Sequence, residues 1–358
     1  MKALEQKISS GKIRPGDKLP SENVLSKEFE ISRQTVRKAL EILENKGLII
    51  AKHGIGTFCA EPSRGKVPTK NIGVVTTYLS DYIFPRVIQG IDTVLNKQGY
   101  SILLKNTNNS RQAEASCLEE LIKKNIDGLI IEPSKTQIFC RHIKLYEQLE
   151  ESRIPYVFIQ GCFSQMSDKP KVLMDDCKGG YLVTKHLISL GHKTIVGVFK
   201  ADDMQGQKRH KGYVMALQEA NIAYDPDKVV WFYTEDRMIH PYHQMKQMSQ
   251  RYEQEPFDAV VCYNDQIAMA VIHALEEKGI SVPKQVAVTG YDNSELGSSL
   301  RIPLTTIAHP QNKLGEMAAE LLLKLINKEL KVGDAGTTIL IEPELVIRES
   351  SQSESISN

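Results

Sequence analysis

Residues 19–58 read LPSENVLSKEFEISRQTVRKALEILENKGLIIAKHGIGTF, and this stretch decides the fold of the N-terminal part of the chain. Ser21 can cap a first helix, whose apolar residues recur at helical spacing, and Ser32 can cap a second helix directly after a short turn. Two helices joined so closely predict a helix-turn-helix.

The second helix of this pair carries a basic surface. Val36, Leu40 and Leu43 recur on one face, whereas Arg33 and Arg37 stand one turn apart on another. Guanidinium groups suit the edges of guanine and the phosphates of DNA. A solvated charged face is the alternative interpretation of such a helix.

The segment 47–58 after that helix predicts two short strands joined by a glycine-containing turn, which we interpret as a wing. Gly54 and Gly56 also begin a G-x-G-x-x-G pattern. Cys59 occupies its last position and no long helix follows, so the pattern does not predict a dinucleotide site.

The positive charge of the chain is concentrated near this segment. Residues 1–70 contain 14 Lys and Arg and 8 Asp and Glu, a net charge of +6, whereas the whole chain has a net charge of +1. A polyanionic partner favours this asymmetry, because basic groups neutralise phosphates and release counterions.

This N-terminal pattern resembles the winged-helix domain of the GntR family of bacterial transcription regulators, on motifs such as LPSE at 19, SRQTVRKAL at 32 and GIGTF at 54. The resemblance implies contact with operator DNA. Asn23 departs from the family, many of whose members have an arginine there. The implied DNA-binding residues are Asn23, Ser32, Arg33, Gln34, Thr35, Arg37 and Lys38 at the major groove or its phosphates, and His53 and Gly54 at the minor groove.

Composition limits the other possibilities. The chain has 358 residues, 41% of them hydrophobic, with no apolar run long enough for a membrane span and no apolar signal-peptide core, so a cytoplasmic location is expected. Its six cysteines include no C-x-x-C pair and are expected to be free thiols. His240 and His243 lack a third ligand nearby in the sequence. No metal site, catalytic site or cofactor is predicted.

Beyond residue 70, short apolar strands alternate with amphipathic helices. This pattern predicts an α/β body with parallel sheets in two halves of similar size, the second beginning after Gly161. The predicted domains are a winged helix-turn-helix at 1–60, a linker at 61–70, a two-lobed effector and dimerisation domain at 71–348, and a disordered tail at 349–358.

Polar residues follow many of the predicted strands. In open parallel sheets ligands bind beyond the carboxyl ends of the strands, and carboxylates and amides there suit sugar hydroxyls. Each such residue could instead cap a helix, as Asp265 could. Tyr82, Trp231 and Tyr233 are candidates to stack on the C–H face of a sugar.

Residues 71–347 resemble the effector domain of the LacI family, which shares the fold of periplasmic sugar-binding proteins (type I). The motifs are NIGVV at 71, VIQGIDTVLNKQGY at 87, DAVVCYNDQIAMAV at 258 and PLTTI at 303, among others. The resemblance implies that Arg209, Asn264 and Asp292 hold sugar hydroxyls. Further candidates are Gln160 and His309 in the cleft, Tyr82 and Arg86 in the loop after the first strand, and Glu235 after a later strand.

The pairing of the two families resembles arabinose-responsive regulators of Gram-positive bacteria. It implies a homodimeric repressor that L-arabinose releases from its operator. Several alternatives stay open: a different sugar, an activator in place of a repressor, or, more remotely, a glycoside hydrolase using two carboxylates in the cleft. An extracytoplasmic binding protein would share the body but lack a basic N-terminal domain.

Overall fold

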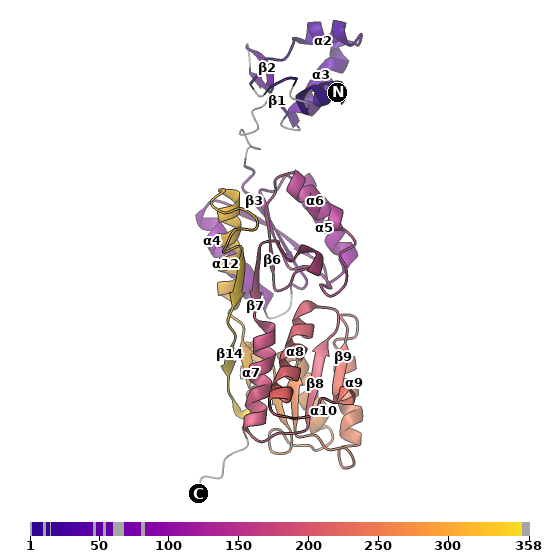
Figure 1. Cartoon of the computed structure of the whole chain (residues 1–358), viewed down its shortest axis with the longest axis vertical. Coiled ribbons are helices and arrows are strands. Elements are labelled where there is room, and N and C mark those ends of the chain that lie inside the picture. The colour runs from indigo at the N-terminus through magenta and orange to yellow at the C-terminus, as the bar shows by residue number, and fades with distance from the viewer. Residues whose placement is uncertain are drawn as a thin grey trace. The chain divides into compact units, whose positions relative to one another are not determined.

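The computed structural model describes residues 2–9, 12–14, 16–45, 48–52, 55–59, 68–79 and 83–352 (Figure 1). The chain forms two compact units, residues 1–69 and 70–358. Among the described residues, none of the helices combines the length and apolar character that crossing a bilayer requires. All six cysteines are free, and four of them are buried.

The first unit is a winged helix-turn-helix, as predicted. Its core is formed by one apolar face from each helix and the first strand, including Leu4, Leu25, Leu43 and Ile49, each at most 5% exposed. The strands pair in antiparallel register, with Ile49 opposite Cys59. The elements are α1 (Lys2–Ser9), α2 (Glu22–Glu28), α3 (Arg33–Asn45), β1 (Ile49–Lys52) and β2 (Gly56–Cys59).

The second unit contains two lobes, each an α/β sandwich. Lobe 1 has a six-stranded sheet of order β13-β7-β6-β5-β3-β4 in which every neighbouring pair is parallel. Alternate strand residues face opposite sides: Val74 packs toward α4 and α12, and Val75 toward α5 and α6 (Figure 1). The elements are β3 (Asn71–Thr76), α4 (Phe84–Lys97), β4 (Ser101–Asn106), α5 (Arg111–Lys123), β5 (Gly128–Ile131), α6 (Ile143–Glu151), β6 (Tyr156–Ile159), β7 (Lys171–Met174), α12 (Gln311–Ile326) and β13 (Thr338–Ile341).

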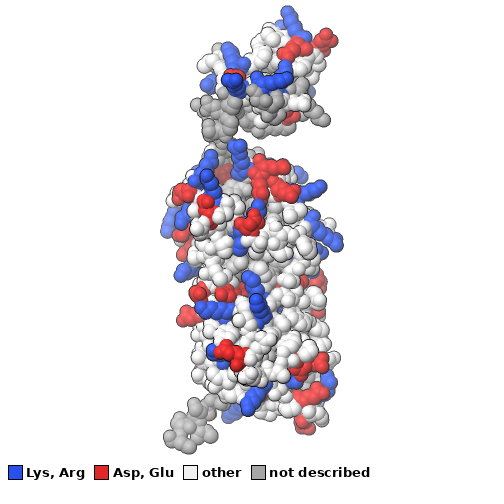
Figure 2. All heavy atoms as spheres, in the orientation of Figure 1, with Lys and Arg blue, Asp and Glu red and all other residues white. Residues whose placement is uncertain are grey.

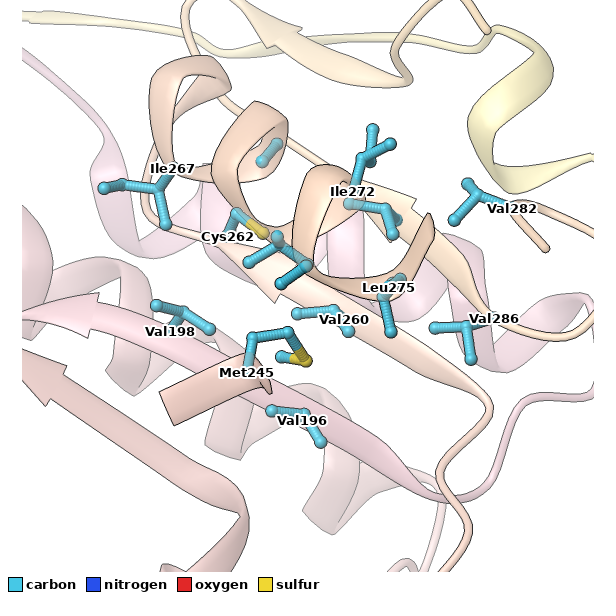
Figure 3. Packing of buried hydrophobic residues seen from close by; sticks show 14 of the residues in the cluster. Val196, Val198, Met245, Val260, Cys262, Ile267, Ile272, Leu275, Val282 and Val286 are labelled. Carbon is cyan, nitrogen blue, oxygen red and sulfur yellow. The ribbon is translucent and has the colours of Figure 1, made fainter. Parts of the chain in front are cut away.

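Lobe 2 has a parallel four-stranded sheet of order β11-β10-β8-β9. In one of its cores, Val198 and Val260 of the sheet face Leu275 of α10 and Met245 of α9, all at most 3% exposed (Figure 3). The elements are α7 (Asp176–Ser189), β8 (Ile195–Lys200), α8 (Met204–Glu219), β9 (Val229–Phe232), α9 (His240–Gln250), β10 (Ala259–Cys262), α10 (Asp265–Glu276), β11 (Ala287–Thr289), α11 (Glu295–Ser298), β12 (Thr306–Ala308) and β14 (Glu344–Val346).

The chain passes between the lobes three times: between β7 and α7, between β12 and α12, and between β13 and β14. The prediction that the second half begins after Gly161 is therefore wrong, because β7 pairs with β6 and completes lobe 1. This pairing is non-local, so the alternation of strands and helices could not reveal it.

The predicted start of a disordered tail at Glu349 is also wrong. Residues 349–351 form a 3₁₀ turn, and Ser350 is fully buried. Its hydroxyl accepts a hydrogen bond from the Thr305 N–H at 2.8 Å and donates one to the Val288 carbonyl at 2.6 Å. The folded body therefore extends at least to Gln352, and residues 353–358 lie outside the described residues.

Candidate functional site

A cavity of about 300 Å³ lies between the two lobes of the second unit, at the carboxyl ends of the strands. That volume lies at the lower end of the range of small-molecule pockets, roughly 300–1,000 Å³. Its polar lining comes from both lobes: Thr77, Tyr78, Asn109, Glu132, Thr136 and Gln160 from lobe 1, and Lys200, Asp203, Gln205, Arg209, Arg237, Tyr263, Asn264, Gln266 and Asp292 from lobe 2.

Arg209, on α8, is buried and makes several contacts with its surroundings. Its Nε donates to Asp176 Oδ1 at 2.9 Å, and one terminal nitrogen donates to the Tyr263 carbonyl at 2.6 Å. The guanidinium carbon lies 3.6 Å from the centre of the Tyr291 ring. Burial disfavours its charge, but Asp176 outweighs this effect and raises the pKa of Arg209. The cavity therefore contains a fixed cation that can donate to a sugar oxygen.

Gln160 and Asp292 line the cavity from an unusual backbone conformation. Their φ angles are +64° and +105°, in the region that side chains other than glycine rarely adopt. Both residues are 2% exposed. Strained backbone is retained where the surrounding structure enforces it, and it concentrates at binding sites.

His309 lies behind Gln160 and does not line the cavity. Its Nε2 is 3.0 Å from Gln160 Oε1. Burial lowers the pKa of His309 to about 3, so the neutral ring donates this hydrogen bond. His309 therefore orients the side-chain amide of Gln160.

Asn264 also lines the cavity, at the start of α10, where its Oδ1 caps the helix by accepting from the Ile267 N–H at 3.1 Å. Arg86 and Glu235 do not line this cavity. Arg86 is exposed and pairs with Glu295 of the other lobe, and exposed Glu235 pairs with Lys135. Tyr82 lies outside the described residues.

Two of the three aromatic candidates, Trp231 and Tyr233, do not line the cavity. Trp231 packs against His210 and Phe199, away from the cavity. Tyr233 is 53% exposed and does not line the cavity either. Instead, the guanidinium of Arg237 in lobe 2 lies 3.7 Å from the centre of the Tyr78 ring in lobe 1. This stack joins the lobes at the cavity.

Glu132 follows β5 directly and was not among the predicted ligands. Its Oε2 accepts hydrogen bonds from the N–H and hydroxyl of Thr77, the former at 2.8 Å. Burial raises the pKa of Glu132 to about 7, despite these bonds and the charge of Lys200. The cavity thus contains a carboxyl that can be either a donor or an acceptor near neutral pH.

Lys200 and Asp203 form a buried ion pair at the end of β8, with 3.1 Å between Nζ and Oδ2. Tyr263 also donates to Asp203 Oδ2, at 2.8 Å. Burial disfavours the Lys200 charge, but Asp203 and Asp202 outweigh this effect and raise the pKa of Lys200. Lys200 is the last residue of β8, and it was not among the predicted ligand residues.

The predicted DNA-binding residues within the described part of the first unit are all exposed: Asn23 on α2, Ser32 before α3, and Arg33, Gln34, Thr35, Arg37 and Lys38 on α3. Ser32 Oγ accepts from the Thr35 N–H at 3.2 Å and so caps α3. His53 and Gly54 lie outside the described residues. Blue side chains of Lys and Arg project from the described part of this unit (Figure 2).

Arg37 is not free in this structure. Its Nε and one terminal nitrogen donate to the two carboxylate oxygens of Glu22, at 3.3 and 3.1 Å. The hydrogen bond to Glu22, followed by its charge, raises the pKa of Arg37. Glu22 thereby fixes the guanidinium on the exposed side of α3.

The comparisons with known proteins agree with this architecture. Residues 1–59 match the family described as "Bacterial regulatory proteins, gntR family", and residues 184–351 match a "Periplasmic binding protein-like domain". The chain is 41% identical to the arabinose metabolism transcriptional repressor of Halalkalibacterium halodurans, with 97% of this chain and 94% of that protein covered. The corresponding repressor of Geobacillus stearothermophilus is 39% identical, with 96% and 94% covered.

The chain belongs to this family of transcriptional repressors. The regulator also resembles solved structures. One is a LacI family regulator from Enterococcus faecium with bound ribose, at 27% identity and a TM-score of 0.65, covering 78% of this chain and 98% of that chain. Another is the regulator CcpA of Lactococcus lactis, at 26% identity and a TM-score of 0.68, with 79% and 99% covered. The predicted combination of a GntR-type head and a LacI-type body is confirmed.

Proposed function

We propose that the regulator represses arabinose-utilisation genes and that L-arabinose, bound in the cavity between the lobes, releases it from operator DNA. The cavity is the observation that carries this proposal. Its volume of about 300 Å³ is lined by the fixed guanidinium of Arg209 and by several amides and carboxylates, and these groups suit the hydroxyls of a small sugar. The names of the two repressors that resemble the chain over nearly its full length support arabinose as the sugar.

The proposed binding mode uses both lobes. Arg209, Asn264 and Asp292 hold the sugar from lobe 2, while Gln160, supported by His309, holds it from lobe 1. A ligand that contacts both lobes favours the arrangement in which they are close together. The sugar can shift DNA affinity only by binding more tightly to one arrangement than to the other.

The proposed DNA-binding mode places α3 in the major groove, where Arg33 and Arg37 contact bases or phosphates. Two copies of the chain, paired as a homodimer, would read the two halves of a pseudo-palindromic operator. Since the partner is chromosomal DNA, we infer that the regulator works in the cytoplasm, and that its effector domain senses a sugar without transforming it.

Isothermal titration of the purified regulator with L-arabinose, D-xylose, D-ribose, D-galactose and glucose tests the sugar. Binding of L-arabinose, with the other sugars at least about tenfold weaker, is the expected result. Ribose is the informative competitor, because a related structure holds it. Stronger binding of ribose, or no binding of any pentose, would remove arabinose from the proposal. Hydrolysis of an aryl-arabinoside by the purified regulator would contradict the proposal that the effector domain binds a sugar without transforming it.

A further inference from the structure

A second cavity, of about 440 Å³, lies in the same unit and is lined mainly by cationic and amide side chains. Arg111, Lys135, Arg141 and His142 supply the cations, and Glu235 is the one carboxylate among its lining residues in the described part of the chain. It lies outside the cavity assigned to the sugar, although Asn109 borders both. None of the sugar-binding roles proposed above uses it.

Two of the four cations already have carboxylate partners. Lys135 pairs with Glu235 across the lobes and lies 3.6 Å from Asp202. His142 lies 2.8 Å from the fully buried Glu114. Burial disfavours the charged imidazole, but Cys140 and Glu114 outweigh this effect and raise the pKa of His142 to about 9, so the ring is cationic at neutral pH.

Arg111 and Arg141 are different, because neither guanidinium has an ion-pair or hydrogen-bond partner among the residues that the structure describes. Arg111 begins α5, a 13-residue helix capped by Ser110, and the positive end of that helix adds to the local potential. Two unpaired guanidiniums beside one hollow leave an excess of positive charge that an anion would balance.

The uncharged residues that line the cavity indicate what kind of anion it would bind. Asn108 and Gln112 are also lining residues, and their side-chain amides suit hydroxyl groups. The cavity holds about 440 Å³, which is more room than inorganic phosphate requires. We propose that this second cavity binds a small sugar phosphate, with its phosphate between Arg111 and Arg141 and its hydroxyls toward the amides.

Such a ligand would act on the contact between the lobes. Lys135 holds Glu235 at the border of this cavity, and Asn109 donates to Thr234 of lobe 2 at 2.6 Å. A phosphate that attracts Lys135 weakens its pairing with Glu235, because the two anions compete for one cation. The second cavity therefore provides a route by which a phosphorylated metabolite alters the closure of the lobes.

Titration of the full-length regulator with D-ribose 5-phosphate, with D-ribose and inorganic phosphate as separate probes, tests the site. The phosphate ester is expected to bind at least about tenfold more tightly than either, and its affinity should fall as salt increases. Arg111→Gln combined with Arg141→Gln should weaken that binding at least about tenfold. Lys123→Gln, an exposed lysine at the other end of α5, is the matched control and should leave it unchanged.

Several outcomes would overturn the proposal. They are absence of binding, equal binding of ribose or of inorganic phosphate, and an equal loss in the Lys123 control. Mutually exclusive binding with L-arabinose, with no complex that holds both ligands at saturating concentrations, would also overturn it, because the ester would then occupy the first cavity. Circular dichroism of the double variant distinguishes a lost site from a lost fold.

Discussion

At the scale of single residues, the resemblance to the LacI family indicated Gln160, Arg209, Asn264 and Asp292 as ligand residues, and all four line the cavity. Arg86 and Glu235 were expected there for similar reasons but lie outside it. A residue that follows a strand must lie at the edge of the sheet. Whether its side chain points into the cavity depends on the conformation of the loop, which the sequence pattern does not give. The Tyr78–Arg237 stack depends on two such loops from different lobes and could not be foreseen.

The raised pKa of Glu132 predicts that the stability of the effector unit depends on pH. Its pKa of about 7 lies above the ordinary value of 4.5, so the folded protein binds more protons than the unfolded chain between these values. Stability should therefore fall as pH rises from 5 to 8, by on the order of 3 kcal/mol from this group. Glu132→Gln should remove this contribution to the fall in the free energy of unfolding. Urea unfolding of both proteins at pH 5 and at pH 8 measures it.

The exposed Glu119 provides the control for this experiment, because Glu119→Gln removes a carboxylate on the outer side of α5. It should leave the pH dependence as it is in the unaltered regulator. If the stability of the Glu132→Gln protein depends on pH as that of the unaltered regulator does, the carboxyl of Glu132 keeps its ordinary pKa in the folded protein.

Asp292 is the residue with which to separate the two proposed binding functions. Asp292→Asn keeps the shape of the side chain, and asparagine tolerates positive φ better than most residues. We expect sugar affinity to fall at least about tenfold through loss of a charge-assisted hydrogen bond. Operator affinity without sugar should be unchanged in a gel-shift titration. Normal release by sugar would contradict the proposed role of Asp292.

At the scale of elements, glycines allow α4 and α12 to pack closely against each other. The sequence did not predict this contact. A Cβ atom at Gly90 would lie 2.1 Å from the Asn312 carbonyl oxygen, and one at Gly315 would lie 2.1 Å from that of Val87. The helices approach closely at both glycines. The repeating pattern of each helix was readable from sequence, whereas the partner across the contact, more than 200 residues away, was not.

Gly90→Ala should destabilise lobe 1, because the added methyl group meets backbone and the helices must separate. The expected loss is about 1–3 kcal/mol in the free energy of unfolding. Gln89→Ala, at the exposed neighbouring position, is the control and should change the stability by less than about 0.5 kcal/mol. A Gly90→Ala protein as stable as the control would show that the helix pair can shift at little cost.

The recognition helix α3 leads to a separate prediction. Arg37→Ala should weaken operator binding by about 1–3 kcal/mol, because it removes a guanidinium that Glu22 holds on the exposed side of the helix. Sugar affinity should stay the same, since Arg37 belongs to the other compact unit. Unchanged operator affinity in a fluorescence-anisotropy titration would exclude Arg37 from the DNA contact.

At the scale of the whole molecule, the two binding functions must be linked if sugar releases DNA. Linkage requires that operator DNA weaken sugar binding by the same factor as sugar weakens operator binding. A typical coupling corresponds to about 5- to 150-fold. Titration of L-arabinose with and without a saturating operator duplex measures this factor, and a factor of one would contradict release by sugar.

The three crossings between the lobes have a consequence for how the regulator is made. The segment from α12 to β14, residues 311–346, supplies a helix and an edge strand to lobe 1 and a paired strand to lobe 2. On the ribosome, where domains fold as they emerge, neither lobe can complete its core until this segment has left the exit tunnel. The last residue of the first unit, Thr69, emerges about 280 residues before Val346, which at roughly 5–20 residues per second is a lead of about 14–56 seconds. A ribosome that stalls in this interval would present the DNA-binding sequence without the sensor that controls it.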